Sequence, residues 1–233
     1  MNNIEKIDIS KLKTLLLDLD GTLINSEKAF FNSFKKVLKE KFDLTITMED
    51  YKKYELEQNA KLLFAFREKG IINNISDKDI MNLIYEDYEH EFKKVILESE
   101  SIDNFKMLKE LKKLKLSLAL VTTCRRYYLN ILIKKLHLEN LFDIIVARED
   151  VLNLKPSSEA YLKSINFLGI NKENCLAFED SKRGIDAAVN CGLQTIQVNN
   201  FTSIKYFDDR TINFNSANDA LRKILTKIKE TKK

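Results

Sequence analysis

Two carboxylates, two residues apart, follow an apolar segment near the N-terminus. The segment 15–17 (LLL) has the length and composition of a buried strand. It is followed by Asp18, Asp20, Gly21 and Thr22. A carboxylate at the end of a buried strand is costly to desolvate without a partner, and a divalent cation is one such partner. Glycine lets the backbone turn sharply, and a threonine hydroxyl or amide can bind an anion. This stretch therefore predicts a site for a metal ion and an anion.

Two other interpretations of this stretch make different predictions. Asp-Gly between apolar residues is also typical of a β-hairpin. Against a hairpin, the residues after Ser26 have apolar side chains at helical rather than alternating spacing. A calcium-binding loop does not fit, because the glycine is fourth rather than sixth from Asp18 and Ala29 occupies the position of the bidentate glutamate. We expect a strand, then a loop, then a helix.

Alternating apolar and amphipathic segments indicate the fold. Beyond residue 102, strands are expected at 116–121, 142–146, 175–178 and 195–198, with helices between them and a final helix that begins near Ser216. Residues 44–47 are a weaker strand candidate, and residues 1–13 read as a polar lead-in. Strands that alternate with helices form parallel sheets through right-handed crossovers. The predicted fold class is α/β, a doubly wound parallel sheet of the Rossmann-like kind.

Between the first strand and the rest of the sheet, apolar residues recur almost throughout at the spacing of a helix. Ser76 and Asp79 have the spacing of a capping box before one long amphipathic segment. We therefore expect an α/β core domain of residues 1–24 and 99–233, interrupted by an α-helical cap domain of residues 25–98. Polar residues of the insertion that could contact a substrate are Tyr51, Lys52, Tyr54, Asn59 and Arg67.

In an open parallel sheet, ligands bind beyond the carboxyl ends of the strands. The residues expected there are Asp18, Asp20, Thr122, Thr123, Glu179, Asp180 and, from a loop, Lys155. Taken singly, Thr122 also fits a helix N-cap, and Lys155 before Pro156 also fits a surface lysine. Glu179 and Asp180 also fit the N-terminus of the next helix through its dipole. Together, these acids, hydroxyls and ammonium group suit a phosphoryl group bound with Mg²⁺.

Composition narrows the expected partners. The formal net charge is +4, but the lysines are interspersed with acids on predicted helix faces, so we expect no nucleic-acid partner. The three cysteines have no paired or metal-type spacing, and no apolar segment has the length of a signal sequence or a membrane span. We expect a cytoplasmic protein without a membrane partner, as a monomer or a weak homodimer.

Four segments, DLDGT, VTT, LKP and EDSKRG, resemble the four motifs of the haloacid dehalogenase superfamily. The helical insertion after the first segment resembles the cap of the phosphatase and β-phosphoglucomutase-like branch. The resemblance covers nearly the whole chain and implies a doubly wound parallel sheet with Mg²⁺ as cofactor. It implies that Asp18 is the nucleophile and Asp20 the general acid and base. Mg²⁺ would be bound by the Asp18 carboxylate, the Asp20 backbone carbonyl and Asp180, with Glu179 close by.

The same resemblance assigns the remaining site residues. Thr122 and Lys155 would bind the transferring phosphoryl oxygens. Further contacts to the phosphoryl group are expected from the backbone amides of Gly21, Thr22 and Thr123. By position rather than by resemblance, Arg125 and Arg126 follow Thr123 and are placed either to meet an anionic substrate or to begin a solvated helix. Asp20 argues against the dehalogenase and phosphonate-cleaving branches, which lack this second aspartate. The chain departs from the usual pattern at Asn25, Leu154 and Glu159, but the chemical groups of the site are intact.

The function predicted from the sequence is that of an Mg²⁺-dependent phosphatase. Its substrate would be a small phosphate monoester, such as a sugar phosphate, a phosphoglycolate-like acid or a nucleotide, and the reaction would pass through an aspartyl-phosphate intermediate. One alternative is a phosphosugar mutase of the same family. A second alternative is a non-catalytic phosphate-binding module.

Overall fold

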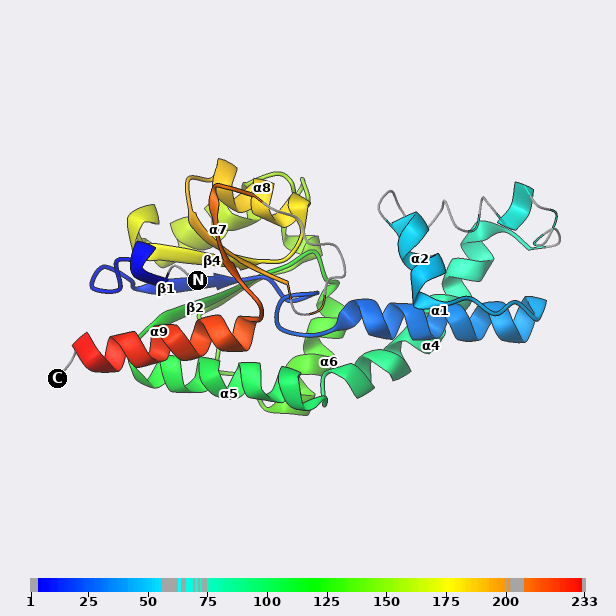
Figure 1. The fold of residues 1–233 in the computed structure, drawn as a ribbon, viewed down its shortest axis with the longest axis horizontal. Coiled ribbons are helices and arrows are strands. Elements are labelled where there is room, and N and C mark those ends of the chain that lie inside the picture. Colours follow the sequence, from blue (N-terminus) through cyan, green and yellow to red (C-terminus); the bar gives the residue numbers. More distant parts are fainter. Residues whose placement is uncertain are drawn as a thin grey trace. The chain divides into compact units, whose positions relative to one another are not determined.

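The computed structural model describes residues 4–55, 63, 66–68, 70, 72, 75–199, 201 and 208–231. The chain divides into two compact units, one formed by Met1–Asn25 with Ile96–Lys233 and one by Ser26–Val95. The first unit contains a parallel sheet, and the described part of the second is helical (Figure 1). We propose that these units are the core and cap domains expected from the sequence.

Six parallel strands form one sheet in the order β3-β2-β1-β4-β5-β6. Their bounds are β1 Thr14–Leu17, β2 Ser117–Val121, β3 Ile144–Val146, β4 Cys175–Glu179, β5 Gln194–Val198 and β6 Thr211–Phe214. Strand β1 is central, because Leu17 pairs with Leu120 of β2 on one side and with Phe178 of β4 on the other. All four β1 residues are buried, as expected for a strand covered on both faces. The predicted fold class is confirmed.

Helices cover both faces of this sheet (Figure 1). Their bounds are α5 Ser99–Lys113, α6 Arg126–Leu136, α7 Glu159–Leu168, α8 Lys182–Asn190 and α9 Ala217–Thr231. Helices α7 and α8 lie on one face, and the contacting pair α5 and α9 lies on the other. The core under α7 and α8 includes Leu16 and Ala177 from the strands and Tyr161 and Ala187 from the helices. Strand β1 is thus enclosed by its neighbouring strands and by helices on both faces of the sheet.

The second unit has its own hydrophobic core. Its long helices are α1 (Ser26–Phe42) and α4 (Asp77–Val95), which pack on each other, and α2 spans Met48–Glu55. Helix α4 begins after Ser76, whose hydroxyl accepts a hydrogen bond from the Asp79 amide at 3.1 Å and donates to the Asp79 carboxylate at 2.6 Å. The helix start predicted at this point is confirmed.

Three local expectations were wrong. Residues 44–47 form no strand, because Ile46 is buried in the core of the second unit and Thr47 caps α2 by accepting a hydrogen bond from the Asp50 amide. Strand β6 was not expected, since its four residues are too few to show a pattern. The N-terminal segment is not simply polar, because Ile4 and Ile7 are buried.

Two of the polar candidates in the second unit have structural contacts within it. Tyr51 is buried against the rings of Phe31 and Phe34, with centroids 5.4 and 5.9 Å away. Arg67 donates hydrogen bonds to the backbone carbonyls of Ile72 and Ile75 and forms an ion pair with Asp77. The side chains of Lys52 and Tyr54, and the whole of Asn59, lie outside the described residues.

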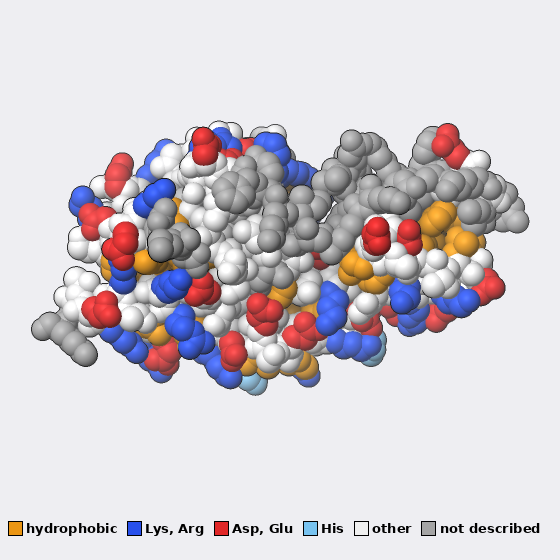
Figure 2. Space-filling model, in the orientation of Figure 1, with side chains coloured by type: hydrophobic (Ala, Val, Ile, Leu, Met, Phe, Trp, Pro, Cys, Tyr) orange, Lys and Arg blue, Asp and Glu red, His pale blue; other side chains and the backbone are white. Residues whose placement is uncertain are grey.

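On the face drawn in Figure 2, Lys and Arg side chains are mixed with Asp and Glu side chains. Side chains of these two kinds form ion pairs such as that of Lys112 with Asp143, 2.5 Å apart. This mixture is the pattern that interspersed lysines and acids produce on solvated helix faces. Within the described part of the chain, no helix combines the length and apolar composition that a membrane crossing requires.

Candidate active site

The loop after β1 is a tight turn closed by its own hydrogen bonds. The Leu19 carbonyl accepts from the amides of Leu23 and Ile24 at 2.9 and 3.1 Å, and the Gly21 amide donates to the Ile24 carbonyl at 2.9 Å. Gly21 has a φ of +79°, and a Cβ atom at this position would lie 2.1 Å from Oδ2 of Asp180. Glycine is therefore needed here both for the backbone conformation and for the close approach to Asp180.

Three carboxylates meet at the carboxyl ends of β1 and β4. Asp18, Glu179 and Asp180 each offer an oxygen, and these oxygens all lie within 4.8 Å of one another. Asp18 and Glu179 are buried, Asp180 is partly buried, and the Thr22 hydroxyl donates to Oδ1 of Asp180 at 3.3 Å. Because β1 and β4 are neighbours in the sheet, Asp18 lies beside Glu179 and Asp180 although these residues are far apart in the chain.

Lys155 is the cation inside this acidic cluster. Its Nζ donates to Oδ1 of Asp18 at 2.6 Å, to Oε1 of Glu179 at 2.5 Å and to the Val121 carbonyl at 2.8 Å. The backbone carbonyl of Lys155 in turn accepts two hydrogen bonds from the Arg183 guanidinium, at 3.0 and 2.5 Å. Lys155 is only 5% exposed, so the alternative of a surface lysine is wrong.

Burial and mutual repulsion oppose ionisation of the acids. Burial raises the pKa of Asp18, although the Lys155 ammonium acts against this shift. Burial also raises the pKa of Glu179 to about 7, and burial with the Asp18 charge raises the pKa of Asp180 well above its usual range. Burial lowers the pKa of Lys155, but the charges of Asp18 and Glu179 outweigh it and the net shift is upward. A further cation would relieve the repulsion among these carboxylates.

The donor atoms of the cluster fit a hard divalent cation. Oε2 of Glu179 is buried and has no hydrogen-bond partner in the described ranges, so it is desolvated without compensation. Carboxylate and carbonyl oxygens are the ligands that Mg²⁺ and Ca²⁺ prefer. Asp18, Glu179 and Asp180 therefore form a candidate metal centre, and the uncompensated Glu179 oxygen is the observation that favours it.

Asp20 and Thr122 form a second pair at the ends of β1 and β2. The Thr122 hydroxyl donates to Oδ2 of Asp20 at 3.3 Å and accepts from the Cys124 amide at 3.0 Å. The N-cap residue of α6 is Arg125, so the interpretation of Thr122 as that N-cap is wrong. Cys124 is buried. Burial, and to a smaller extent the Asp20 charge, raises the pKa of its thiol, as expected for a packed, unreactive cysteine.

The structure thus brings most of the predicted site residues together. Asp18, Lys155, Glu179 and Asp180 form one cluster, which Thr22 joins through its hydroxyl. The backbone amides of Gly21 and Thr22 donate to carbonyls of their own loop in this structure, which gives both residues a structural role there. Thr123 is partly buried and Arg125 is exposed, and the substrate contacts of these two residues stay predictions.

Three residues of the site were missed by the sequence analysis. They are Tyr161, whose hydroxyl donates to Oε1 of Glu179 at 2.6 Å, Arg183, and Gly184. A Cβ atom at Gly184 would lie 1.9 Å from Oε2 of Glu179. A tyrosine on a core-facing stripe needs a partner for its hydroxyl, and a glycine within a helix often marks a close approach. These were the signals that the sequence offered.

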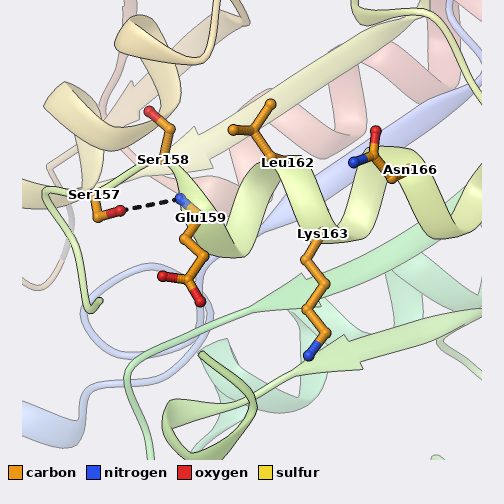
Figure 3. A pocket seen from close by; sticks show the side chains of 6 residues that line it. All are labelled: Ser157, Ser158, Glu159, Leu162, Lys163 and Asn166. Atoms are coloured by element: carbon orange, nitrogen blue, oxygen red, sulfur yellow. Dashed lines mark hydrogen bonds between the residues drawn. The ribbon is translucent and has the colours of Figure 1, made fainter. Parts of the chain in front are cut away.

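A hollow at the start of α7, shown in Figure 3, does not include the acidic cluster. It has a volume of about 530 Å³ and is lined by Ser157, Ser158, Glu159, Leu162, Lys163 and Asn166. The Glu159 carboxylate accepts from the backbone amides of Leu152 and Asn153, and Lys163 donates to the Asp150 carbonyl. These charged groups stabilise the preceding loop, and we assign no chemistry to the hollow.

The fold and the site define an α/β protein with an acidic, lysine-containing centre at the carboxyl ends of its central strands. The chain belongs to the haloacid dehalogenase-like hydrolases, whose family pattern matches residues 15–198. The resemblance seen in the four sequence motifs is therefore confirmed. Membership of this family makes the chain an enzyme of the hydrolase class.

Several known proteins are similar over most of the chain. The phosphorylated carbohydrates phosphatase of Thermotoga maritima is 28% identical over 189 residues, which cover 79% of this chain and 84% of that protein. The pyrophosphatase PpaX of Bacillus cereus is 28% identical over 192 residues, covering 81% and 83%. The crystal structure of a haloacid dehalogenase superfamily hydrolase, subfamily IA, from Geobacter sulfurreducens superposes with a TM-score of 0.72. It covers 92% of this chain and 97% of that chain at 17% identity, and this similarity concerns the fold.

Proposed function

We propose that this protein is an Mg²⁺-dependent phosphatase that hydrolyses a small phosphate monoester. The observation that carries the proposal is the Asp18 carboxylate, held by the buried Lys155 ammonium within 4.8 Å of two further acids. Such an arrangement presents an oxygen nucleophile and the positive charge that an anionic substrate requires. The names of the relatives support phosphate-releasing hydrolysis, since one is a phosphorylated carbohydrates phosphatase and the other a pyrophosphatase.

Asp18 would attack the phosphorus atom and become the aspartyl phosphate. A carboxylate is repelled by an anionic phosphate, and the Lys155 ammonium reduces that repulsion. Lys155 and the Thr122 hydroxyl would bind the transferring phosphoryl oxygens. The Asp18 and Asp180 carboxylates and the Asp20 carbonyl would hold Mg²⁺, with Glu179 close by. When bound, Mg²⁺ would supply charge neutralisation and orient the phosphoryl group.

Asp20 would move the protons. As the Asp18 oxygen bonds to phosphorus, the bond to the leaving oxygen breaks, and the protonated Asp20 carboxyl would donate its proton to that oxygen. The Asp20 carboxylate would then accept a proton from water, whose oxygen attacks phosphorus and releases phosphate from Asp18. General acid and base catalysis of this kind contributes about a hundredfold or more to a rate. Asp18 and Asp20 end the cycle in the states in which they began it.

The experiment that tests this function is a panel of phosphate monoesters. The panel should include sugar phosphates, phosphoglycolate and nucleotides, each incubated with purified protein in Mg²⁺ and again with a chelator. We expect release of inorganic phosphate from at least one class, and loss of that release with the chelator. A matched control is Asp18→Asn, which keeps the size of the side chain and removes its charge.

Two other outcomes would contradict the proposal. An isomerised sugar phosphate without released inorganic phosphate, detected by NMR of the products, would indicate a phosphosugar mutase. Binding of Mg²⁺ and phosphate without turnover of any monoester would indicate a non-catalytic phosphate-binding module.

A further inference from the structure

Tyr161 of α7 contacts two members of the acidic cluster. Its hydroxyl donates to Oε1 of Glu179 at 2.6 Å, and the Lys155 ammonium lies 5.3 Å from the centre of its ring. Tyr161 is fully buried. Burial, and to a smaller extent the Glu179 charge, raises the pKa of its hydroxyl well above the usual range, so the hydroxyl stays protonated and remains a donor. In the proposed function, Tyr161 is neither the nucleophile nor the general acid and base.

The Glu179 carboxylate is constrained from two directions. Oε1 accepts from both Lys155, at 2.5 Å, and Tyr161, while Oε2 has no hydrogen-bond partner in the part of the chain that the structure describes. The whole carboxylate also lies against Gly184, where an added Cβ atom would be 1.9 Å from Oε2 and 2.3 Å from Oε1. The carboxylate therefore has one oxygen fixed by two donors and one oxygen left over.

We propose that Tyr161 is a positioning residue for the metal centre. Its hydroxyl fixes the orientation of Glu179, so that Oε1 stays on Lys155 and Oε2 stays available to the cation. This role rests on the proposed function, because it assumes that the acidic cluster binds Mg²⁺. Without the hydroxyl, Lys155 alone would hold Oε1, and the carboxylate would rotate about that single contact. Hydrogen bonds to ligating carboxylates affect metal affinity in this way.

The test is a calorimetric titration of chelator-treated protein with Mg²⁺. Tyr161→Phe removes the hydroxyl and keeps the ring, so the core under α7 stays filled. We expect its Kd for Mg²⁺ to be about tenfold weaker than that of the wild type, the lower end of the range seen for such partners. Tyr161→Met, which fills similar space without a donor, should show the same weakening and completes the test if the first variant does not fold.

A matched control is Tyr88→Phe, which removes the hydroxyl of a largely buried tyrosine of α4 in the other unit. It should bind Mg²⁺ within twofold of the wild type. If Tyr161→Phe lowers the unfolding midpoint of the metal-free protein but leaves the Kd for Mg²⁺ unchanged, Tyr161 has only a packing role and the proposal is wrong.

The titration needs no substrate, so it can be read separately from the proposed function. A wild type that binds Mg²⁺ but hydrolyses no monoester would remove the phosphatase assignment, while the comparison of variants would still decide the role of Tyr161. A wild type that binds no Mg²⁺ would contradict both the proposed function and the proposed role of Tyr161.

Discussion

At the residue scale, one buried ammonium group holds the acidic cluster together. Lys155 uses all three of its N–H donors, two of them on carboxylates that are themselves buried. A buried ion pair is of doubtful net benefit compared with an apolar pair, but removing only one partner leaves an uncompensated charge. We therefore expect Lys155 to affect stability in addition to its proposed role in phosphate binding.

Lys155→Met should destabilise the protein strongly. Loss of one partner from a buried ion pair costs about 3–5 kcal/mol, and this ammonium is buried against both Asp18 and Glu179. The free energy of unfolding is measured by chemical denaturation of the metal-free protein at neutral pH. The matched control is Lys112→Met, whose half-exposed ion pair with Asp143 should contribute less than about 1 kcal/mol. Equal losses in the two variants would contradict the account.

The site residues differ in how well sequence reasoning could predict them. Asp18, Asp20 and Asp180 were predictable because acids directly after apolar strands are conspicuous. Tyr161 was not, because a tyrosine on the apolar stripe of a helix has the same pattern as any core residue. Its hydrogen bond to Glu179 depends on how α7 packs on the sheet, which no local pattern records.

At the element scale, the first turn of α8 supports the end of β4. Ser181 is the N-cap of α8, and its hydroxyl accepts a hydrogen bond from the Gly184 amide at 3.1 Å. The same glycine lies directly against the Glu179 carboxylate. The end of β4, the turn after it and the start of α8 therefore fix the Glu179 carboxylate together. Glycine is needed at position 184 because any larger side chain would overlap this carboxylate.

Gly184→Ala should displace Glu179 and reduce activity. The added Cβ atom would overlap Oε2, so the carboxylate must move away from its contacts with Lys155 and Tyr161. We expect turnover and Mg²⁺ affinity to fall about tenfold or more, as for other partners of ligating groups. Both are measured on the substrate found by the monoester panel and by calorimetry.

The control for this variant is Gly169→Ala at the end of α7. Gly169 has a φ of +60° but nothing within 4 Å of an added Cβ atom. This substitution should lower stability by about 1 kcal/mol through backbone strain and leave Mg²⁺ affinity unchanged. Wild-type Mg²⁺ affinity in Gly184→Ala would contradict the packing argument.

At the scale of the whole molecule, the strand order creates the site. Because β1 lies between β2 and β4, the residues that follow these three parallel strands meet at the carboxyl ends of the strands. The alternation of strands and helices was sufficient to predict this fold. Strand β6 was not predicted, and residues 44–47 were wrongly considered a weak strand. Four residues carry too little pattern to separate a strand from a loop that packs on a core.

The measurement that tests the central claim most directly is identification of the phosphorylated residue during turnover. The enzyme, mixed with Mg²⁺ and a substrate found by the panel, is quenched in acid and analysed by peptide mass spectrometry. We predict a phosphoryl group on Asp18 of the wild type, and neither that group nor turnover in Asp18→Asn. A phosphoryl group on another side chain, or turnover of Asp18→Asn at the wild-type rate, would contradict the account.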